Sequence, residues 1–526
     1  MASSRTFAVS SGEPSSPLRS RKLQAMKNVG SSWFSLGVNV AVGFFLSPFI
    51  LHRLGDDAFG LWILIFSITG YYGLFDFGIR SSIIRYVSKY TATKDYEDLN
   101  RLVSTSLFSY GCLAMILLLI TMVGSRYVDV FFRISPGFHS TARMLFLLVG
   151  TSLSIGFPLS VFGGILEGLQ KFYVLNLTQV ISTLTRALLI LVALSHGGGL
   201  ITIAIITVIF PLIASVSYAV MVMRMLPLKL HRRFISGASF REVLNYGSVT
   251  FMILLAARLR FRTDAMVIGT FLSASAITYF TIGSKFVDYA SEVVQSLAQI
   301  FTPMSSHFHT TGNFEKLRRI FMLGNRACAL TIFPISTVLI LLGKSAISVW
   351  VGQRYASSYS VLLILLIPST LYVAQATSNK ILFGMSEHRS LGVVVLLEGV
   401  ANLILSIYLV RRLGIVGDAL GTAIPMLCTA LFFLPRHLCR LLNVPLRTFV
   451  RESYVLPAVL CIPLALTLWL MRGWFTARTY PQLLFQVAVG GIVYGVGLLW
   501  VFVTREPEGI RLRMRITQRM QQAWGR

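Results

Sequence analysis

The chain is poor in charged residues, which make up 13% of its 526 residues, whereas about 25% is usual in soluble globular proteins. Apolar residues account for 55%, and the mean hydropathy is +0.72. This composition excludes an ordinary soluble domain and indicates an integral membrane protein.

Cysteine is also scarce, with five residues in the chain. Cys112, Cys328, Cys428 and Cys461 fall inside long apolar runs, and Cys439 lies just beyond the end of one. Thiols in such positions are typically buried and free. The sequence therefore gives no indication of a disulfide framework.

Acidic residues are few. The chain contains 20 Asp and Glu and 47 Lys and Arg, which gives a formal net charge of +27. If both termini are cytoplasmic, most basic residues fall on the cytoplasmic side, as the positive-inside rule requires. The clusters KLHRRF (229–234), KLRRI (316–320) and RLRMR (511–515) then lie beside anionic membrane lipids. We therefore expect membrane lipids as partners and no nucleic acid.

Phosphate-binding glycine loops of the P-loop type are absent, so ATP is not expected as an energy source within this chain. We also predict no metal and no cofactor. The first 28 residues lack an apolar stretch that ends at a small-residue cleavage site, so we expect a disordered cytoplasmic tail there rather than a signal peptide.

Long apolar runs are abundant instead. Runs of roughly 20 residues, enough to cross about 30 Å of hydrocarbon as a helix, recur from Val29 onward. Because they are continuous and not alternating, they predict helices and exclude barrel strands. We expect an all-α polytopic membrane protein with about fourteen transmembrane helices. The predicted spans are 29–51, 61–79, 102–125, 144–166, 173–195, 200–223, 243–270, 276–302, 320–342, 359–383, 391–410, 415–438, 453–471 and 482–503.

The sequence repeats itself at an offset of about 214 to 218 residues. DYEDLNRL from Asp95 matches NFEKLRRI from Asn313, and ILEGLQK from Ile165 matches ILFGMSE from Ile381. Six spans in each half require parallel repeats around a central cleft, where transporters of repeated design hold their substrate.

The domain boundaries follow from the repeat. We predict a tail at 1–28, lobes at 29–223 and 243–438, a basic cytoplasmic linker at 224–242, two additional transmembrane helices within 453–503 and a basic cytoplasmic tail at 504–526.

Several motifs carry a family resemblance. LGDDAFGLW (54–62), DFG (76–78), TDAMVIG (263–269), WVGQRYA (350–356) and RLGIVGDALGT (412–422) resemble those of the polysaccharide-biosynthesis transporters. These are the bacterial O-antigen and exopolysaccharide flippases of the multidrug/oligosaccharidyl-lipid/polysaccharide exporter superfamily.

The resemblance implies a function and a location. It implies a flippase that moves an undecaprenyl-diphosphate-linked oligosaccharide from the cytoplasmic to the outer leaflet by alternating access, without covalent chemistry. It also implies a bacterial inner-membrane location and, as a further partner, the polysaccharide polymerase machinery.

Three arginines interrupt the predicted span 243–270. An arginine at the centre of a membrane helix costs about 2.5–3.5 kcal/mol. Arg258 and Arg262 share a helical face, whereas Arg260 points away and has Asp264 as its i+4 neighbour. We expect an Arg260–Asp264 structural pair, and expect Arg258 and Arg262 to bind the diphosphate that the resemblance implies. The alternative is an interfacial segment whose arginines extend to the lipid headgroups.

Other charged residues also fall inside predicted spans. Lys285, Asp288 and Glu292 form one helical stripe, either as a cleft wall or coupling site or as a Lys285–Asp288 pair that only holds helices together. Asp76 and Arg80 are spaced as a structural pair or a gate.

Arg186 has no partner on its own helix. Glu398 is the candidate partner across the repeat.

Other functions compete with a surface-glycan flippase. A drug/cation antiporter of the same superfamily would need an anionic cleft, and a peptidoglycan-precursor flippase would be expected to carry arginines in its first two spans. A membrane glycosyltransferase or ligase would use Asp56 and Asp57 in the first outward loop for a metal, but these residues are better explained as caps of the following helix.

Overall fold

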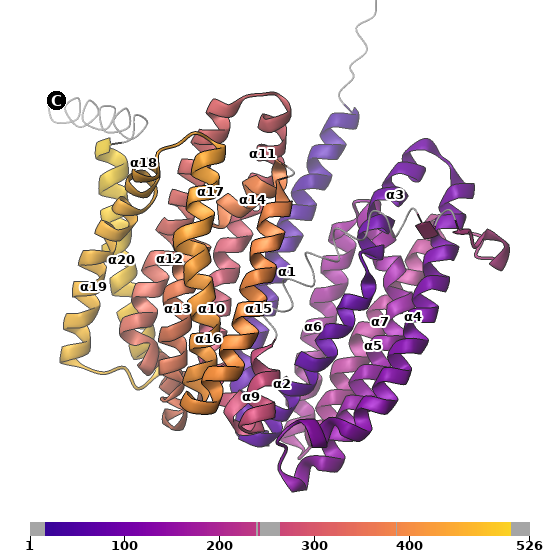
Figure 1. Cartoon of the computed structure of the whole chain (residues 1–526), viewed down its shortest axis with the longest axis horizontal. Coiled ribbons are helices and arrows are strands. Elements are labelled where there is room, and N and C mark those ends of the chain that lie inside the picture. Colours follow the sequence, from indigo (N-terminus) through magenta and orange to yellow (C-terminus); the bar gives the residue numbers. More distant parts are fainter. Residues whose placement is uncertain (1–15, 238–239, 242–262, 386, 506–526) are drawn as a thin grey trace, which may run out of the picture. The chain divides into compact units, whose positions relative to one another are not determined.

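The computed structural model describes residues 16–237, 240–241, 263–385 and 387–505 (Figure 1). All regular secondary structure in these residues is helical. The first elements are α1 Ser16–Leu54, α2 Asp56–Gly70, η1 Tyr71–Asp76, α3 Ile79–Thr93, α4 Tyr96–Phe131, η2 Pro136–Phe138, α5 His139–Gly168, α6 Phe172–Ser195, α7 Leu200–Met225 and η3 Arg232–Phe234. They are followed by α9 Asp264–Phe271, α10 Ala274–Ala298, α11 Phe301–Thr310, α12 Phe314–Val351, η4 Gln353–Tyr355, α13 Ser358–Val373, α14 Ala376–Gly384, α15 His388–Leu413, α16 Ile415–Cys428, η5 Thr429–Phe433, α17 Leu434–Leu441, α18 Leu446–Val450, η6 Arg451–Val455, α19 Leu456–Trp474 and α20 Tyr480–Arg505.

Eleven stretches of helix in the described residues are long and apolar enough to cross a membrane, and the pair α13 and α14, bent by 44°, makes a twelfth. This confirms a polytopic all-α membrane protein. The other two predicted spans are 276–302, where a polar stripe on α10 lowers the hydropathy, and 243–270, most of which lies outside the described residues. The count of fourteen therefore stays a prediction.

Helix α1 begins at Ser16, inside the segment 1–28 that the sequence predicted as a disordered tail. Residues 18–27 (LRSRKLQAMK) are mostly strong helix formers. The expectation was wrong for this part because it relied on low hydropathy and ignored helix propensity.

The chain divides into two compact units that alternate along the sequence. The first unit contains residues 1–49, 75–122 and 147–250, and the second contains 50–74, 123–146 and 251–526. Helices α1, α4 and α5 thus each contribute to both units. The predicted division into lobes at the linker 224–242 stays a prediction.

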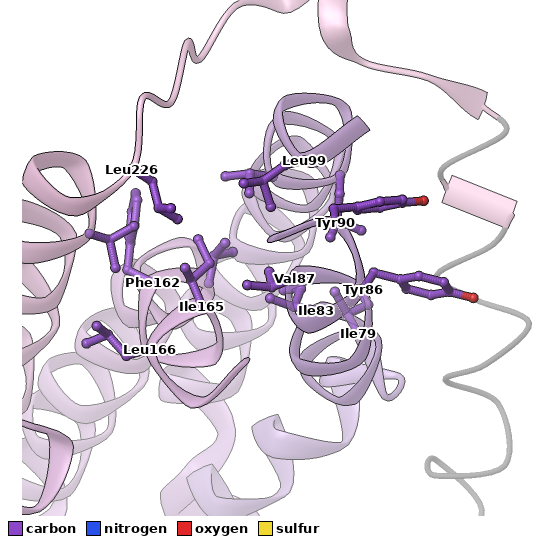
Figure 2. Close-up of a cluster of buried hydrophobic side chains, with 14 of the residues drawn as sticks. Ile79, Ile83, Tyr86, Val87, Tyr90, Leu99, Phe162, Ile165, Leu166 and Leu226 are labelled. Atoms are coloured by element: carbon purple, nitrogen blue, oxygen red, sulfur yellow. The ribbon is translucent and has the colours of Figure 1, made fainter. Parts of the chain in front are cut away.

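The core of the first unit joins α3, α4, α5 and α7. Figure 2 shows Ile83 and Val87 of α3 directed toward Ile165 of α5, with Leu99 of α4 above them. Each of these side chains is fully buried. The cluster fixes α3 to the polar end of α4, where the chain carries Glu97, Asp98 and Arg101.

Helix α10 is central to the second unit, and glycines allow close neighbours on two sides. A Cβ on Gly60 of α2 would lie 1.7 Å from the carbonyl oxygen of Ala274. A Cβ on Gly283 of α10 would lie 2.5 Å from the carbonyl oxygen of Ser358 on α13. Lipid is as apolar as the helices, so close packing of this kind holds membrane helices together.

The internal repeat is visible in local structure. Asp95 Oδ1 accepts a hydrogen bond from the backbone N–H of Asp98 at the start of α4 (3.0 Å), and Asn313 Oδ1 accepts one from Lys316 at the start of α12 (3.1 Å). These matched caps lie 218 positions apart, so the sequence repeat marks equivalent helix starts.

Matched glycines end the next repeated segment. A Cβ on Gly168, the last residue of α5, would lie 2.9 Å from the carbonyl oxygen of Ile84 on α3, and a Cβ on Gly384, the last residue of α14, would lie 2.8 Å from that of Thr302 on α11. Both repeats therefore use a glycine to bring a span against a short helix.

The two additional helices, α19 and α20, pack on α12. Leu464 and Leu468 of α19 are buried together with Leu342 of α12, and the hydroxyl of Tyr494 on α20 donates to the carbonyl of Leu330 (2.8 Å). They are an extension of the second unit.

Candidate functional site

A pocket of about 290 Å³ in the second unit is lined by several polar side chains of its membrane helices. Helices α2, α9 and α10 form its walls. The side chains that line it include Trp62, Phe66, Ser67, Asp264, Ser284, Lys285, Asp288, Tyr289 and Glu292. We refer to it as the polar pocket.

The stripe predicted on 276–302 forms one wall of the polar pocket. Asp288 and Glu292 are exposed on α10, and Lys285 is half-buried. The ammonium of Lys285 lies 5.8 Å from the ring centroid of Tyr289. Among the described residues no ion pair joins Lys285 to Asp288, and both residues line the polar pocket together with Glu292. Their role in binding or coupling stays a prediction.

Asp264 is the first residue of α9 and closes the pocket on another side. Its Oδ1 accepts a hydrogen bond from the Thr422 hydroxyl (2.9 Å), and Thr422 Oγ1 accepts one from the Asn402 amide (3.1 Å). Arg260 lies outside the described residues, as do Arg258 and Arg262. The Arg260–Asp264 pair and the proposed diphosphate ligands therefore stay predictions.

Behind Asp264, α15 and α16 form a buried polar cluster. Ser406 donates to Asn402 Oδ1 (3.0 Å), and Glu398 is buried one turn before Asn402 on α15. The carboxylate of Asp418 is fully buried, and neither of its oxygens has a hydrogen-bond partner among the described residues.

A buried carboxylate of this kind is stable only when it is protonated or when a nearby positive charge neutralises it. The sequence prediction missed Asp418, although an acidic residue inside an apolar span was a sufficient signal. Glycines explain its position, because Gly417 and Gly421 bring α16 so close to α15 that a Cβ on Gly421 would lie 2.3 Å from Ser406 Oγ.

In the first unit the structure corrects the prediction for Asp76 and Arg80. The Arg80 guanidinium pairs with Glu167 on α5 (Nη2–Oε1 2.6 Å). Asp76 accepts the backbone N–H of Arg80 (3.3 Å) and the hydroxyl of Tyr110. The sequence spacing could not reveal Glu167, because α5 reaches α3 only through tertiary packing.

Arg186 lies within α6, which corresponds to the predicted span 173–195, and its side chain is half-buried. The structure records no ion pair or hydrogen bond for it within the described ranges. It belongs to the first unit and Glu398 to the second, so their pairing stays a prediction.

The prediction that Asp56 and Asp57 cap α2 was wrong. The capping residue is Gly55, and no side chain caps the helix. The buried carboxylate of Asp56 instead pairs with Arg354 (Oδ2–Nη2 2.6 Å) and accepts the hydroxyl of Tyr355. Arg354 and Tyr355 escaped the prediction because they lie about 300 residues away in the sequence. This carboxylate is therefore engaged in a structural contact.

The described residues contain no group of three or more His, Cys, Asp or Glu side chains that could hold a metal ion. The polar pocket can bind a ligand that both donates and accepts hydrogen bonds, and the Trp62 and Phe66 rings add apolar faces. These features suit recognition and transport.

Residues 25–309 match the model of the family described as polysaccharide biosynthesis protein. Two curated relatives are similar over most of their length. The "Uncharacterized membrane protein EpsK" of Bacillus subtilis is 22% identical over 79% of this chain and 83% of its own length. A "Putative O-antigen transporter" of Shigella flexneri is 19% identical over 78% of this chain and 96% of its own.

Two solved structures share the fold. The "Lipid II flippase MurJ, inward closed conformation" superposes with a TM-score of 0.69 at 16% identity, covering 91% of this chain and 98% of that one. The inward-facing structure of "a multidrug resistance MATE family transporter of the MOP superfamily" gives 0.67 at 16% identity, covering 79% of this chain and 95% of that one.

Proposed function

The chain belongs to the polysaccharide biosynthesis protein family, and from that premise we propose that it flips an undecaprenyl-diphosphate-linked oligosaccharide from the cytoplasmic to the outer leaflet of the bacterial inner membrane. Membership makes it a membrane transporter or flippase and not a catalyst. The identity of the cargo is the proposal, and a relative named as an O-antigen transporter supports it.

The polar pocket is the observation that carries this proposal. Sugar hydroxyls both donate and accept hydrogen bonds, and the pocket supplies an ammonium at Lys285, carboxylates at Asp288 and Glu292, and an aromatic wall at Trp62. Polar groups are costly in a membrane helix unless they face a cavity or a partner. A pocket that is polar inside an apolar unit therefore suits the hydrophilic part of an amphiphilic cargo.

The diphosphate of the cargo needs cations. Arg258 and Arg262 directly precede α9, whose first residue lines the polar pocket, and Arg186 supplies a half-buried guanidinium in the first unit. Guanidinium groups bind phosphate oxygens through paired, charge-assisted hydrogen bonds. We propose that Arg258 and Arg262 bind the diphosphate while the polyprenyl tail stays in the lipid.

One observation favours a second candidate, an exporter of cationic compounds. The described wall of the polar pocket carries Asp264, Asp288 and Glu292 against Lys285 alone, an acidic balance that suits a cation. Residues 258–262 add three arginines to the same region of the sequence and would reverse this balance, so we place the anionic cargo first.

The test is leaflet-resolved accumulation of lipid-linked glycan in cells that lack the protein. The cells are complemented with the wild type, with Arg258→Ala/Arg262→Ala, or with Arg258→Lys/Arg262→Lys. Each charge-assisted hydrogen bond contributes about 1.5–3 kcal/mol, so the double alanine variant should flip about a hundredfold more slowly or worse. The double lysine variant should retain part of the activity, because charge without the bidentate geometry remains.

Arg478→Ala is the matched control, since Arg478 is exposed beyond the end of α19. Normal appearance of the lipid-linked glycan outside in cells that lack the protein would refute the proposal. Accumulation of a peptidoglycan precursor would assign that cargo instead. If the glycan crosses normally and a cationic dye accumulates in the cells, the exporter alternative is correct.

A further inference from the structure

An apolar groove on the first unit has no part in the proposed transport path. Its cavity volume is about 580 Å³, within the range of about 300–1,000 Å³ that is usual for ligand pockets. Phe77, Phe108, Cys112 and Leu113 form one side, and Ile235 and Phe240 form the other. We refer to it as the linker groove.

The linker groove lies where α4 changes character. Residues 96–106 of this helix carry Glu97, Asp98 and Arg101, whereas residues 107–123 carry no charge. This change places the groove at the boundary between headgroups and hydrocarbon. Phe108 is 55% exposed there, so the groove opens to the exterior of the unit and a lipid chain could enter it from the side.

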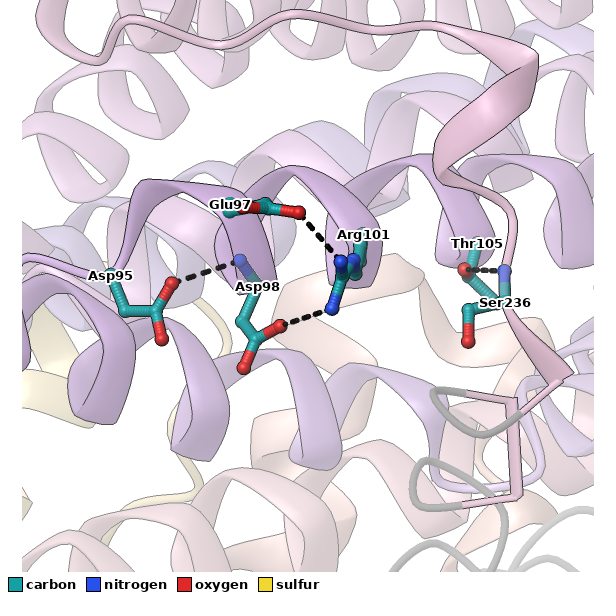
Figure 3. A network of polar contacts seen from close by, with 6 residues as sticks. All are labelled: Asp95, Glu97, Asp98, Arg101, Thr105 and Ser236. Atoms are coloured by element: carbon teal, nitrogen blue, oxygen red, sulfur yellow. Dashed lines mark hydrogen bonds and ion pairs between the residues drawn. The ribbon is translucent and has the colours of Figure 1, made fainter.

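The second wall is a segment of the predicted linker that is fixed on α4. The backbone N–H of Ser236 donates to Thr105 Oγ1 (3.1 Å), as Figure 3 shows, and the backbone N–H of Lys229 donates to Asn100 Oδ1 (2.8 Å). Ile235 and Phe240 expose 37% and 43% of their surface beside these anchors. Water would solvate such side chains poorly, and an acyl chain would cover them.

An interruption between the helices η1 and α3 shapes the wall that contains Phe77. Phe77 has a φ of 47° and Gly78 a φ of 76°, between η1 and α3. A bulky residue in the left-handed region is unusual, and such conformations persist where the surrounding structure imposes them. Phe77 lies at this interruption and lines the linker groove together with Ile79, the first residue of α3.

The linker segment that forms the second wall of the groove is basic. The segment 229–241 contains Lys229, Arg232, Arg233 and Arg241 and no acidic residue. Lys229, Arg233 and Arg241 are exposed. On the facing part of α4, Arg101 is already bound to Glu97 (2.6 Å) and Asp98 (3.1 Å), as Figure 3 shows. An anionic headgroup therefore finds basic side chains beside the groove.

We propose that the linker groove binds an anionic glycerophospholipid, with one acyl chain between α4 and Phe240 and the phosphate beside Lys229, Arg233 and Arg241. Apolar walls and an adjacent basic segment match the two ends of such a lipid. Bound in this way, the lipid fills the space between the linker segment and α4.

Cys112 provides a direct readout, because its exposed thiol lines the linker groove. Cys428, exposed in the second unit, is an internal control, and the other three thiols are buried. Purified, delipidated full-length protein is labelled with N-ethylmaleimide while phosphatidylglycerol or phosphatidylcholine is titrated. Phosphatidylglycerol should slow labelling of Cys112 at least fivefold without changing Cys428, and phosphatidylcholine should have little effect.

Arg233→Gln/Arg241→Gln should remove this protection and leave the basal labelling rate of Cys112 unchanged. Arg447→Gln/Arg478→Gln removes two exposed charges from the second unit and should retain it. Equal protection by phosphatidylcholine would overturn the requirement for an anionic headgroup. Protection by a polyprenyl phosphate but not by phosphatidylglycerol would assign an isoprenoid occupant, and no protection by any lipid would refute the site.

Discussion

Asp56 is a buried acidic residue whose partners come from a distant part of the chain. Its carboxylate binds Arg354 and Tyr355, and its backbone carbonyl accepts the hydroxyl of Thr278 (2.7 Å). These contacts attach the start of α2 to α10 and η4. Arg354 is 72% exposed at its side chain, so the hydrogen bond from Tyr355, and not the ion pair, should provide most of the stabilisation.

Replacement of Asp56 tests this view. Asp56→Ala leaves the buried Tyr355 hydroxyl without its acceptor, which costs about 1–3 kcal/mol. The melting temperature in detergent should fall, whereas the neighbouring Asp57→Ala should change it little. An equal effect of the two substitutions would show that the Tyr355 contact contributes nothing specific.

The same contact predicts an alkaline limit of stability. Burial, and then the hydrogen bond to Asp56, raise the pKa of Tyr355 above its usual value of about 10. A group whose pKa is raised by folding stabilises the protein below its unfolded pKa and loses that contribution as the pH rises. The melting temperature should fall above about pH 10, and Tyr355→Phe should reduce this fall. An unchanged profile in Tyr355→Phe would exclude this tyrosine as the cause.

Helical spacing indicated which residues of α10 share a face, but it did not identify the ion-pair partners of the charged residues. Spacing placed Lys285, Asp288 and Glu292 on one face of α10, and all three line the polar pocket. The partner of Arg80 proved to be Glu167, 87 positions away. Helical periodicity fixes directions around one axis only, so it cannot select a partner on another helix.

At the scale of elements, the hairpin of α15 and α16 depends on glycine. A Cβ on Gly421 would meet Ser406 at 2.3 Å, whereas nothing lies within 4 Å of one on Gly392 of the same hairpin. Elsewhere in a helix, replacement of glycine by alanine stabilises by about 0.5–1 kcal/mol.

The two glycines should therefore respond in opposite directions. Gly421→Ala should separate the helices and destabilise the protein by about 1–3 kcal/mol, and Gly392→Ala should raise the melting temperature slightly. Thermal unfolding in detergent measures both. If both variants gained stability, the close approach of α15 and α16 would be refuted.

The sequence predicted elements well and their interruptions poorly. Apolar runs located the spans because a helix needs a fixed length to cross hydrocarbon. The 44° bend between α13 and α14 was invisible in hydropathy. Gln375 at this break donates a hydrogen bond to the backbone carbonyl of Ala430 in η5 (2.8 Å). A contact with a distant element therefore stabilises the bend, and no local sequence pattern encodes it.

For the whole molecule, the excess of basic residues predicts which way the chain crosses the membrane. With both termini in the cytoplasm, a green fluorescent protein fused after Arg526 should fluoresce, and alkaline phosphatase at the same place should be inactive. The opposite pair of results would invert the topology and place the segment 229–241 on the outer side.

The internal repeat does not depend on this topology. The matched caps at Asp95 and Asn313 show that the repeated segments begin equivalent helices.

The distribution of thiols has a practical consequence for following transport. Of the five cysteines, Cys112 is exposed in the first unit and Cys428 in the second, and the other three are buried. The unmodified chain thus accepts one spin label on each unit. Distances between the two labels, measured by pulsed electron resonance with and without cargo, would record the transport cycle directly in wild-type protein.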